Sequence, residues 1–277
     1  AKGSRTTGRF HPINKRNDPG RSFDTVTLSG EICTIFLESH LTMLKVSRKS
    51  GGEVEIFHSI QGEGVSIGVP SVFLRLATCN LSCRWCDTKY TWDWANFNYD
   101  TEVVELDTAE LRHKIQAFKC THVVVTGGEP LLQQAELGPL VASLSGEGFT
   151  FEVETNGTIA PSTELLRYID QWNVSPKLRT SGNMPEKRLI PMALQIFAEL
   201  PRAFFKFVIS AESDVDEVCN LREQYKIPAE RVLLMPEGRT PDALSRKNGW
   251  LSDACVKYGF RFTTRLHIML WGDERGR

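Results

Sequence analysis

Beyond Gly51, the chain alternates short apolar runs rich in β-branched residues with longer amphipathic stretches. Strands are predicted at 53–57, 71–77, 121–126, 149–154, 172–175, 203–209, 231–235 and 261–270, and helices at 107–118, 131–146, 161–170, 186–200, 213–225 and 240–258. Apolar strands that alternate with helices form a parallel sheet covered by those helices. Because the pattern holds about six strand–helix units instead of eight, it predicts an α/β fold, an open, partial βα barrel.

The first part of the chain differs in composition from this alternating region. Residues 1–50 begin with a basic stretch that contains Gly, Pro and Asn and has no sustained periodicity. We therefore predict a flexible N-terminal extension followed by one domain over 51–277. The sequence begins with Ala, and Met43 stands shortly before the first clear strand. We hypothesise that the native protein starts at Met43, which upstream peptides from the natively expressed protein would contradict.

The overall charge is nearly balanced, with 33 Lys and Arg residues against 34 Asp and Glu residues. A net charge of -1 gives no general attraction to nucleic acid or to an anionic membrane, so we expect no direct partner of either kind. No run approaches the roughly 20 apolar residues of a membrane span, and the N-terminus has no signal-peptide pattern. A cytoplasmic location is therefore expected.

Three of the seven cysteines, Cys79, Cys83 and Cys86, form a C-x3-C-x2-C run directly after a predicted strand. This crowding suits metal ligation in a reducing compartment better than a disulfide framework. Three thiolates on one short loop can hold a 4Fe-4S cluster. Because the motif supplies no fourth cysteine, one iron is left open and can bind the amino and carboxylate groups of S-adenosylmethionine (SAM). The motif predicts a radical SAM enzyme.

Other uses of three cysteines fit the sequence less well. A structural zinc site usually has four Cys or His ligands in two separated pairs, and the sequence has no second C-x2-C. His58 and His113 are single residues in unrelated segments. A simple ferredoxin would supply four cysteines on a smaller chain. A chance cluster of free thiols remains as the other alternative.

Several separated motifs accompany the cysteines. They are EIFHSIQGEG (55–64), FLRLATCNLSCRWCDT (73–88), VVVTGGEP (123–130), EVETNGT (152–158), VSPK (174–177), LMPEG (234–238) and RLHIMLWG (265–272). From about Val54 to its C-terminus, the sequence resembles the radical SAM superfamily and, within it, the 7-carboxy-7-deazaguanine synthase family. The GGEP loop is typical of the superfamily, whereas the SIQGEG box and the CDT ending narrow the resemblance to this family.

The resemblance implies a reaction and its cofactors. In this family, 6-carboxy-5,6,7,8-tetrahydropterin is rearranged to 7-carboxy-7-deazaguanine with loss of ammonia, on the route to queuosine and related 7-deazapurines. SAM acts there as a reusable cofactor, because the 5′-deoxyadenosyl radical abstracts a hydrogen and later returns it. The resemblance also implies a Mg²⁺ ion, a flavodoxin or ferredoxin as electron donor, and a homodimer.

The resemblance assigns roles to residues around the cofactors. Trp85 would stack on the adenine, although simple loop packing also explains an aromatic residue there. Thr88 would bind Mg²⁺, and a helix cap is its alternative. The expected SAM contacts are Trp85, Gly128, Glu129, Ser175, Pro176, Lys177, Met235, Pro236, Glu237 and Gly238. Without the cysteines, the Gly127-Gly128 pair and the segment 235–238 would be read only as turns.

Substrate contacts are expected where the sequence places polar groups that match a carboxylated pterin. The residues implied are Ile60, Gln61, Gly62, Glu63, Arg75, Thr126 and His267. Glu63 can accept hydrogen bonds from pterin N–H groups, and Arg75 can bind a carboxylate through two parallel hydrogen bonds. Arg75 lies in an otherwise apolar strand, so a salt bridge to Glu63 or Glu129 is its alternative. His267 lies in the last predicted strand, where a histidine satisfied in the core is the alternative.

Two further functions stay open at this point. Glycyl-radical-enzyme activases also have C-x3-C-x2-C and a GGEP-like loop, but they act on a protein backbone. The SIQGEG box and Arg75 argue against them, because a protein substrate needs no pterin clamp. A cluster-bearing binding or electron-transfer protein is the other alternative, and the intact GGEP and SPK segments count against it.

Overall fold

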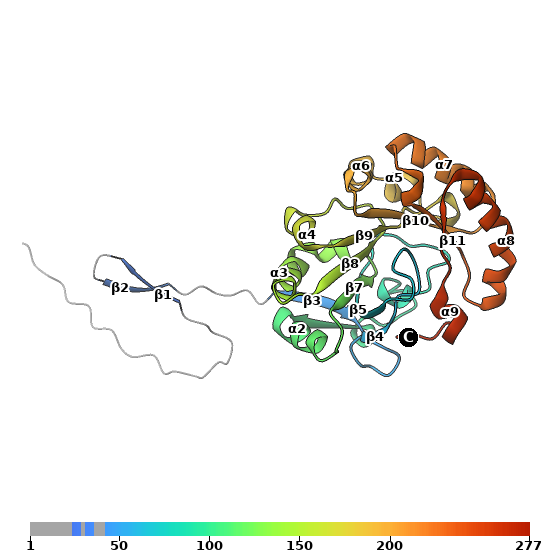
Figure 1. The fold of residues 1–277 in the computed structure, drawn as a ribbon. Helices are drawn as coiled ribbons and strands as arrows, with labels where there is room; N and C mark the ends of the chain where they lie inside the picture. The colour runs from blue at the N-terminus through green and yellow to red at the C-terminus, as the bar shows by residue number, and fades with distance from the viewer. Residues whose placement is uncertain (1–23, 29–30, 36–41) are drawn as a thin grey trace, which may run out of the picture. The chain divides into compact units, whose positions relative to one another are not determined.

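The computed structural model describes residues 24–28, 31–35 and 42–277 and divides the chain into two units, residues 1–41 and 42–277. In the first unit, β1 (Asp24–Leu28) and β2 (Glu31–Ile35) pair as antiparallel strands (Figure 1). The remainder of the predicted extension up to residue 41 lies outside the described residues.

The second unit is built on a parallel sheet that contains seven of its strands. In spatial order these are β5 (Pro70–Leu76), β7 (His122–Gly127), β8 (Thr150–Thr155), β9 (Gln171–Val174), β10 (Ala203–Ile209), β11 (Val232–Pro236) and β12 (Arg261–Phe262). The first and last strands do not pair, so the sheet curves without closing (Figure 1). This confirms the predicted open βα barrel.

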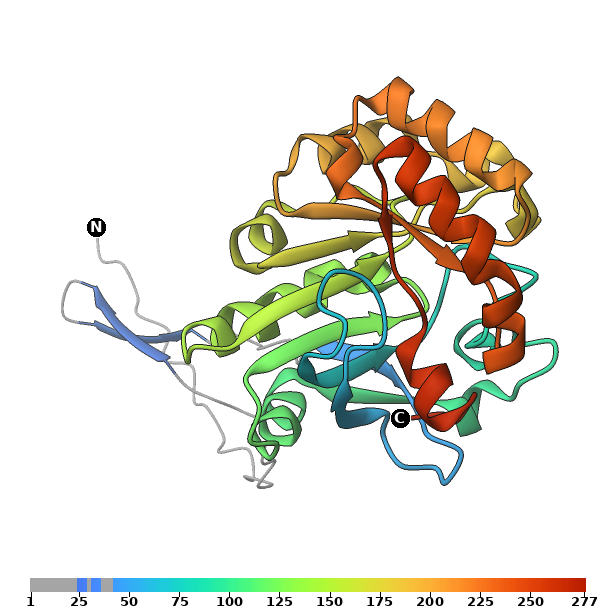
Figure 2. The ribbon, with the colours of Figure 1, turned by 45° about the vertical axis from the view of Figure 1, so that its right-hand side comes forward.

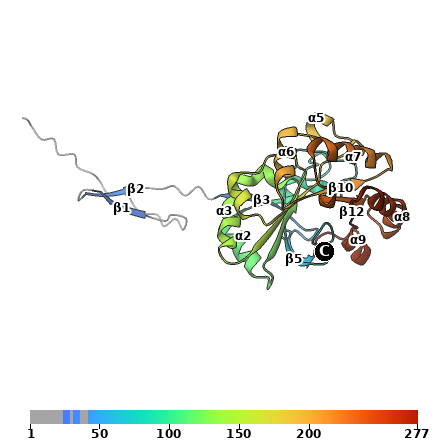
Figure 3. The same ribbon diagram turned by 45° about the horizontal axis from the view of Figure 1, so that its top comes forward.

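Helices cover the convex face of the sheet, outside the curve (Figures 1 and 3). They are α2 (Thr108–Gln116), α3 (Gln134–Ser145), α4 (Thr163–Tyr168), α5 (Pro185–Arg188), α6 (Pro191–Glu199), α7 (Ser213–Tyr225) and α8 (Pro241–Tyr258). Phe151, Trp172 and Phe205 are fully buried in the core cluster that these layers share. Among the described residues, no helix combines the length and the apolar character that crossing a membrane requires.

One predicted helix is interrupted. The sequence predicts a single helix over 186–200, but the structure has α5 and α6 with Leu189 and Ile190 between them. Pro191 begins α6, because a proline lacks the N–H that would continue the preceding helix and suits a first helical position. Short 3-10 turns occur at Lys89–Thr91 (η1), Pro130–Gln133 (η2), Arg179–Ser181 (η3) and Ala229–Arg231 (η4).

Two strands that the sequence did not predict extend the sheet, and the strand predicted at 53–57 lies instead at 56–60. β3 (Met43–Ser47) pairs antiparallel with β6 (Val103–Asp107) and touches β5, and α1 (Tyr99–Glu102) precedes β6. β4 (Ile56–Ile60) pairs antiparallel with β5. Residues 43–47 therefore belong to the sheet, and the prediction of a flexible extension as far as residue 50 is wrong for them. Lys45 interrupts the apolar residues of β3, so the strand has no clear period.

The predicted C-terminal strand is also wrong beyond Phe262. β12 has two residues, and Leu266–Trp271 forms a helix, α9. Over six residues, a mostly apolar run fits a strand or a helix equally well, so periodicity cannot separate them. The backbone N–H of Leu266 donates to the carbonyl of Gly62 at 2.8 Å, which places α9 beside the segment after β4 (Figure 2).

Candidate active site

A cavity of about 220 Å³ opens at the carboxyl ends of the parallel strands. Thr126 is the last but one residue of β7, Met235 is the last but one residue of β11, and Ser175 follows β9; all three residues line the cavity. Ligand sites in open α/β sheets lie at this end of the strands, because the loops there carry the polar groups.

Most residues that the sequence predicts for the site line this one cavity. They are Ile60, Gln61, Gly62, Glu63, Arg75, Cys79, Cys83, Trp85, Cys86, Thr88, Thr126, Gly128, Ser175, Lys177, Met235, Glu237, Gly238 and His267. Glu129, Pro176 and Pro236 are not among the lining residues. Motifs that are separated by up to two hundred residues in the chain therefore meet at one place.

The three cysteines lie on a loop after β5, residues 78–88, which we call the cluster loop. Cys83 is buried, Cys79 and Cys86 are partly buried, and all three thiols are free. Burial raises the pKa of the Cys79 thiol to about 12, so a positive metal centre is needed to displace its proton. Thr78 begins the loop with φ of 72°, an uncommon value for a threonine that turns the chain sharply out of the strand.

The donor set fits a 4Fe-4S cluster better than a single ion. Within the described part of the chain, no three His, Cys, Asp or Glu side chains converge closely enough to hold one metal ion. A four-iron cluster instead takes one thiolate at each separate iron corner. The cavity lining includes the three cysteines and no fourth one among the described residues. The arrangement fits a cluster with one corner left for SAM.

The two glycines of the GGEP loop have a packing role. A Cβ on Gly128 would lie 1.8 Å from the carbonyl oxygen of Thr78, and one on Gly127, at φ of 131°, would lie 2.0 Å from that of Leu76. The N–H of Gly128 donates to Leu76 at 2.9 Å. The glycines thus let the GGEP loop pack directly against the start of the cluster loop.

Glu129 does not face the cavity, contrary to its predicted contact with SAM. Its carboxylate is fully buried and accepts from the backbone N–H of Asn156 at 2.6 Å, the hydroxyl of Thr155 at 2.7 Å and the N–H of Leu131 at 3.1 Å. A buried carboxylate needs such donors, so Glu129 ties the GGEP loop to the segment after β8. Burial nevertheless raises the pKa of Glu129 above its usual value.

Trp85 and Lys177 form one wall of the cavity. The Lys177 ammonium lies 5.5 Å from the centre of the Trp85 ring and donates to the hydroxyl of Ser175 at 3.0 Å. The indole Nε1 of Trp85 is buried and has no hydrogen-bond partner in the structure. A buried donor without an acceptor suits a wall that a polar ligand completes.

The segment after β11 approaches the cavity from the opposite side. Glu237 is paired with Lys247 at 2.7 Å, and the carbonyl of Gly238 accepts from Nη1 of Arg265 at 2.8 Å. Pro236 lies at the end of β11 and Pro176 in the loop after β9. The two prolines shape the chain next to lining residues without lining the cavity themselves.

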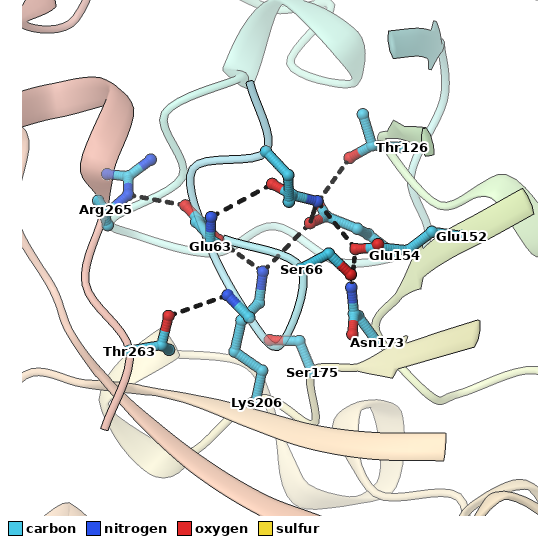
Figure 4. A network of polar contacts seen from close by, with 12 residues as sticks. Glu63, Ser66, Thr126, Glu152, Glu154, Asn173, Ser175, Lys206, Thr263 and Arg265 are labelled. Atoms are coloured by element: carbon cyan, nitrogen blue, oxygen red, sulfur yellow. Dashed lines mark hydrogen bonds and ion pairs between the residues drawn. The ribbon is translucent and has the colours of Figure 1, made fainter. Parts of the chain in front are cut away.

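A network of alternating charges crosses the cavity (Figure 4). The Lys206 ammonium lies 2.5 Å from Glu63 and 3.3 Å from Glu154, and Arg265 Nε lies 3.0 Å from Glu63. Arg265 also pairs with Asp87 of the cluster loop. Burial alone would raise the pKa of Glu63, but Lys206 and Arg265 hold it well below its usual value. Burial would lower the pKa of Lys206, whereas Glu154 and Glu63 raise it.

Gln61 is bound on both ends of its amide. Its Nε2 donates to Glu152 at 2.9 Å and to Glu154 at 3.3 Å, and its Oε1 accepts the N–H of Glu63 at 3.2 Å. The hydroxyl of Thr126 also donates to Glu154, at 2.9 Å (Figure 4). Gln61 and Thr126 therefore both hold Glu154, which lines the cavity.

Arg75 has an acidic partner, but not one of the two that the sequence suggested. Its Nε donates to Glu55 at 2.8 Å, and Glu55 is fully buried and also accepts from Tyr90 at 3.0 Å. Burial would lower the pKa of Arg75, but Tyr90 and Glu55 raise it, so the guanidinium stays charged. Because only Nε contacts Glu55, the two Nη groups remain available to a ligand.

His267 lines the cavity from α9. Its Nε2 lies 3.5 Å from Nη2 of Arg265, and a Cβ on Gly62 would lie 2.2 Å from its Nδ1. Gly62 therefore makes room for the imidazole. Burial lowers the pKa of His267, and the Arg265 charge acts in the same direction. This shift favours the neutral imidazole, in which one ring nitrogen donates a hydrogen bond and the other accepts one.

The hydroxyl of Thr88 lies 3.6 Å from Sγ of Cys86 and makes no cap contact to η1, although Thr88 stands at its N-cap position. The hydroxyl is therefore not used as a helix cap, the alternative that the sequence left open.

Several residues of the site were missed: Asp87, Glu154, Lys206 and Arg265 line the cavity, and the buried Glu55 contacts the lining residue Arg75. The signal that singled out Arg75, a charge inside an apolar strand, applies equally to Lys206 in AFFKFVI. Glu55, Glu154 and Arg265 lie within the motifs at 55–64, 152–158 and 265–272. Their position in these motifs is the sequence signal that could have identified them as residues of the site. Their mutual pairing could not be found this way, because it joins segments distant in the sequence.

Comparison with known proteins agrees with this geometry. Residues 75–233 match the Radical SAM superfamily. The 7-carboxy-7-deazaguanine synthase of Pyrobaculum aerophilum is 44% identical over 226 residues, which cover 81% of this chain and 96% of that protein. The 7-carboxy-7-deazaguanine synthase of Hyperthermus butylicus is 37% identical over 223 residues, which cover 78% of this chain and 91% of that protein.

A solved structure extends the likeness to the fold. The crystal structure of QueE from Escherichia coli is 26% identical, has a TM-score of 0.61 and covers 84% of this chain and 97% of that chain. The chain therefore belongs to the radical SAM superfamily and, within it, to the 7-carboxy-7-deazaguanine synthase family.

Proposed function

We propose that this protein is a carbon–nitrogen lyase that converts 6-carboxy-5,6,7,8-tetrahydropterin to 7-carboxy-7-deazaguanine with loss of ammonia, in queuosine and 7-deazapurine biosynthesis. The observation that carries the proposal is one cavity with two kinds of lining. Three thiols line it on the cluster loop, and a carboxylate paired with an ammonium and a guanidinium group lines it as well.

The cofactors of this reaction have matching groups. A 4Fe-4S cluster on Cys79, Cys83 and Cys86, together with SAM, supplies radical chemistry when bound. Trp85, Lys177 and Ser175 form the wall that we assign to SAM, with the Trp85 N–H as a free donor. The hydroxyl of Thr88 is our candidate protein ligand for Mg²⁺, which takes the rest of its shell from water and substrate oxygens.

The substrate is a small molecule with a carboxylate and a guanidine-like ring edge. Arg75 can bind the carboxylate through its two Nη groups, while Glu55 fixes the guanidinium from behind. Glu63 and Glu154 both pair with Lys206, and their carboxylate oxygens can accept from the ring N–H groups. His267, neutral and at the cavity wall, offers one more polar contact.

The activase alternative has no support in the site. Its substrate is a polypeptide backbone, which is neutral, whereas this cavity is bordered by buried ion pairs. Such pairs suit a small charged ligand, because desolvated charges need partners of opposite sign. We further propose a flavodoxin or ferredoxin as electron donor, a homodimer and a cytoplasmic location, which the family resemblance favours.

The test is a reconstitution experiment. The protein is loaded anaerobically with iron and sulfide and incubated with reductant, SAM and 6-carboxytetrahydropterin, and products are followed by mass spectrometry. We expect a product lighter than the pterin by one ammonia, which requires SAM. The C83A variant, which lacks one cluster ligand, serves as a control and should give none. Pterin-independent release of 5′-deoxyadenosine alone would reject the pterin as substrate.

A further inference from the structure

Two side-chain N–H groups from outside the cysteine motif point at sulfur atoms of the cluster loop. Nε1–H of Trp92 donates to Sγ of Cys86 at 3.3 Å, and Nδ2–H of Asn183 donates to Sγ of Cys83 at 3.3 Å. Trp92 follows η1, whereas Asn183 lies 100 residues beyond Cys83, after η3. Two unrelated segments thus converge on two of the three thiols.

The neighbours of Asn183 fix its orientation. Its Oδ1 accepts the backbone N–H of Ser82 at 3.0 Å, and its own backbone N–H donates to the hydroxyl of Ser181 at 3.3 Å. Because the amide oxygen already has a donor, the amide nitrogen is the end that faces Cys83. The carbonyl of Ser181 also accepts the N–H of Arg84 at 2.9 Å, which holds this segment against the cluster loop.

The third thiol differs from the other two. Among the described residues, Cys79 has no side-chain N–H donor, and the nearby backbone N–H of Leu81 acts to lower its pKa against the effect of burial. Only the donors to Cys83 and Cys86 are side chains, so only these two can be removed by substitution.

Hydrogen bonds to cluster thiolates change how easily the cluster accepts an electron. The reduced cluster carries one more negative charge than the oxidised cluster, so an N–H group stabilises the reduced form more strongly. Each such bond raises the reduction potential, and partners outside the ligand set are known to tune metal sites in this way. We propose that Trp92 and Asn183 are positioning residues that raise the reduction potential of the 4Fe-4S cluster through Cys86 and Cys83.

This inference rests on the cluster of the proposed function but not on the pterin reaction. The reduction potential is measured without pterin, by a redox titration that follows the electron paramagnetic resonance (EPR) signal of the reduced cluster. A failure of the pterin assay therefore leaves this test intact, and a failure of this test leaves the pterin assay intact.

The first variant is W92F, which removes the N–H and keeps an aromatic ring. W94F is its matched control, because Trp94 lies two residues away and packs edge-on against Tyr99. We expect equal iron and sulfide contents, with a more negative midpoint potential for W92F than for the unsubstituted protein and W94F. An unchanged potential in W92F would overturn the role of Trp92.

The second variant is N183D, which keeps an oxygen for Ser82 and replaces the donor to Cys83. Its control is N80D, which adds the same charge beside Cys79 at a side chain that contacts Thr158 and Asn156. We expect N183D to shift the potential further in the negative direction than N80D. Equal shifts would show that charge alone is responsible and would refute the role of Asn183.

A spectroscopic measurement tests the Trp92 contact on the unsubstituted protein, even where a variant loads no cluster. The protein is labelled with ¹⁵N-tryptophan, and pulsed EPR of the reduced cluster is used to detect coupling to ¹⁵N. We expect one coupling that is present in the unsubstituted protein and in W94F and absent from W92F, whereas any coupling from Trp85 on the cluster loop persists in all three proteins. Identical ¹⁵N couplings in the unsubstituted protein and W92F would exclude the hydrogen bond.

Discussion

Glu63 lies between two cations, and this position makes it both a candidate ligand for the pterin and a structural residue. Lys206 and Arg265 each contact one of its oxygens, and all three side chains are mostly buried. Removing one partner from a buried ion pair is far more costly than removing the pair, because the remaining charge stays desolvated. The cavity therefore depends on this carboxylate before any ligand binds.

The stability contributed by Glu63 should depend on pH. Its folded-state pKa is depressed below the ordinary value of 4.5, so its contribution is present above about pH 4.5 and is lost as pH falls toward the folded-state pKa. We expect E63Q to lower the free energy of unfolding by about 3–5 kcal/mol at pH 7. The difference from the unsubstituted protein should shrink at acid pH, as measured by urea unfolding at pH 7 and pH 3.5. A difference independent of pH would contradict an ionised Glu63.

Arg75 is the residue on which carboxylate recognition depends. In R75A, the KM for the pterin should rise about 10- to 100-fold, the loss expected for hydrogen bonds to a charged group. The visible spectrum of the reconstituted cluster should stay unchanged, because Arg75 contacts Glu55 and no cysteine. R75K keeps the positive charge but cannot donate two parallel hydrogen bonds to a carboxylate. Its KM for the pterin should therefore lie between those of the unsubstituted protein and R75A. Loss of iron in R75A would make Arg75 structural.

At this scale, residue identity was easier to predict than residue contacts. The three cysteines, Trp85 and Arg75 were found because a motif or an unexpected charge singles them out, and all line the cavity. Glu129 belongs to an equally clear motif, but its carboxylate caps neighbouring N–H groups. Sequence shows that a carboxylate is present, whereas its direction depends on backbone geometry that the motif does not report.

The GGEP loop is the element that packs against the cluster loop and supports it. We expect G128A to lose most of its iron on reconstitution, because a Cβ there would collide with the backbone of Thr78 and push the cluster loop away. The iron and sulfide content of the purified variant measures this. G249A is the matched control, since a Cβ at Gly249 in α8 meets no atom within 4 Å.

In the G249A control, the free energy of unfolding should rise by about 1 kcal/mol, because alanine has a higher helix propensity than glycine. Full iron loading of G128A would show that the two loops can separate without loss of the site.

The elements themselves were predicted where their pattern is long or well bounded. β10 was predicted at its observed bounds, and α7 likewise, because β10 is an apolar run rich in aromatic and β-branched residues and α7 is an amphipathic stretch of thirteen residues. β3, β6 and α9 are five or six residues long and mix apolar with charged or ambiguous positions. Their structure is decided by tertiary partners, which a local pattern does not contain.

At the scale of the whole folded unit, Glu55 joins residues that are far apart in the sequence. Besides Arg75, it accepts from Nε of Arg275 at 3.4 Å, and Arg275 also pairs with Glu102 at 2.9 Å. The Arg275 guanidinium lies 3.3 Å from the centre of the Tyr90 ring. One buried carboxylate thus anchors the substrate-side arginine and the C-terminal segment together.

This sharing predicts coupling between the two arginines. In a double-mutant cycle of R75M, R275M and the double variant, the free energies of unfolding should be non-additive by about 0.5–3 kcal/mol, the range for residues in one network. Chemical unfolding of the four proteins measures the coupling. As a control, R75M combined with R112M, which breaks the distant Arg112–Glu147 pair, should be additive. Additive effects of R75M and R275M would mean that Glu55 serves each arginine independently.

The last strand of the sheet, β12, consists of two residues, Arg261 and Phe262, and both are exposed. A sheet edge recruits another chain by offering a row of unpaired N–H and C=O groups, and so short a strand offers very few. The open barrel can therefore remain open without risk of edge-to-edge polymerisation at β12. In the proposed homodimer, the sheet would therefore not continue from one protomer into the next at β12.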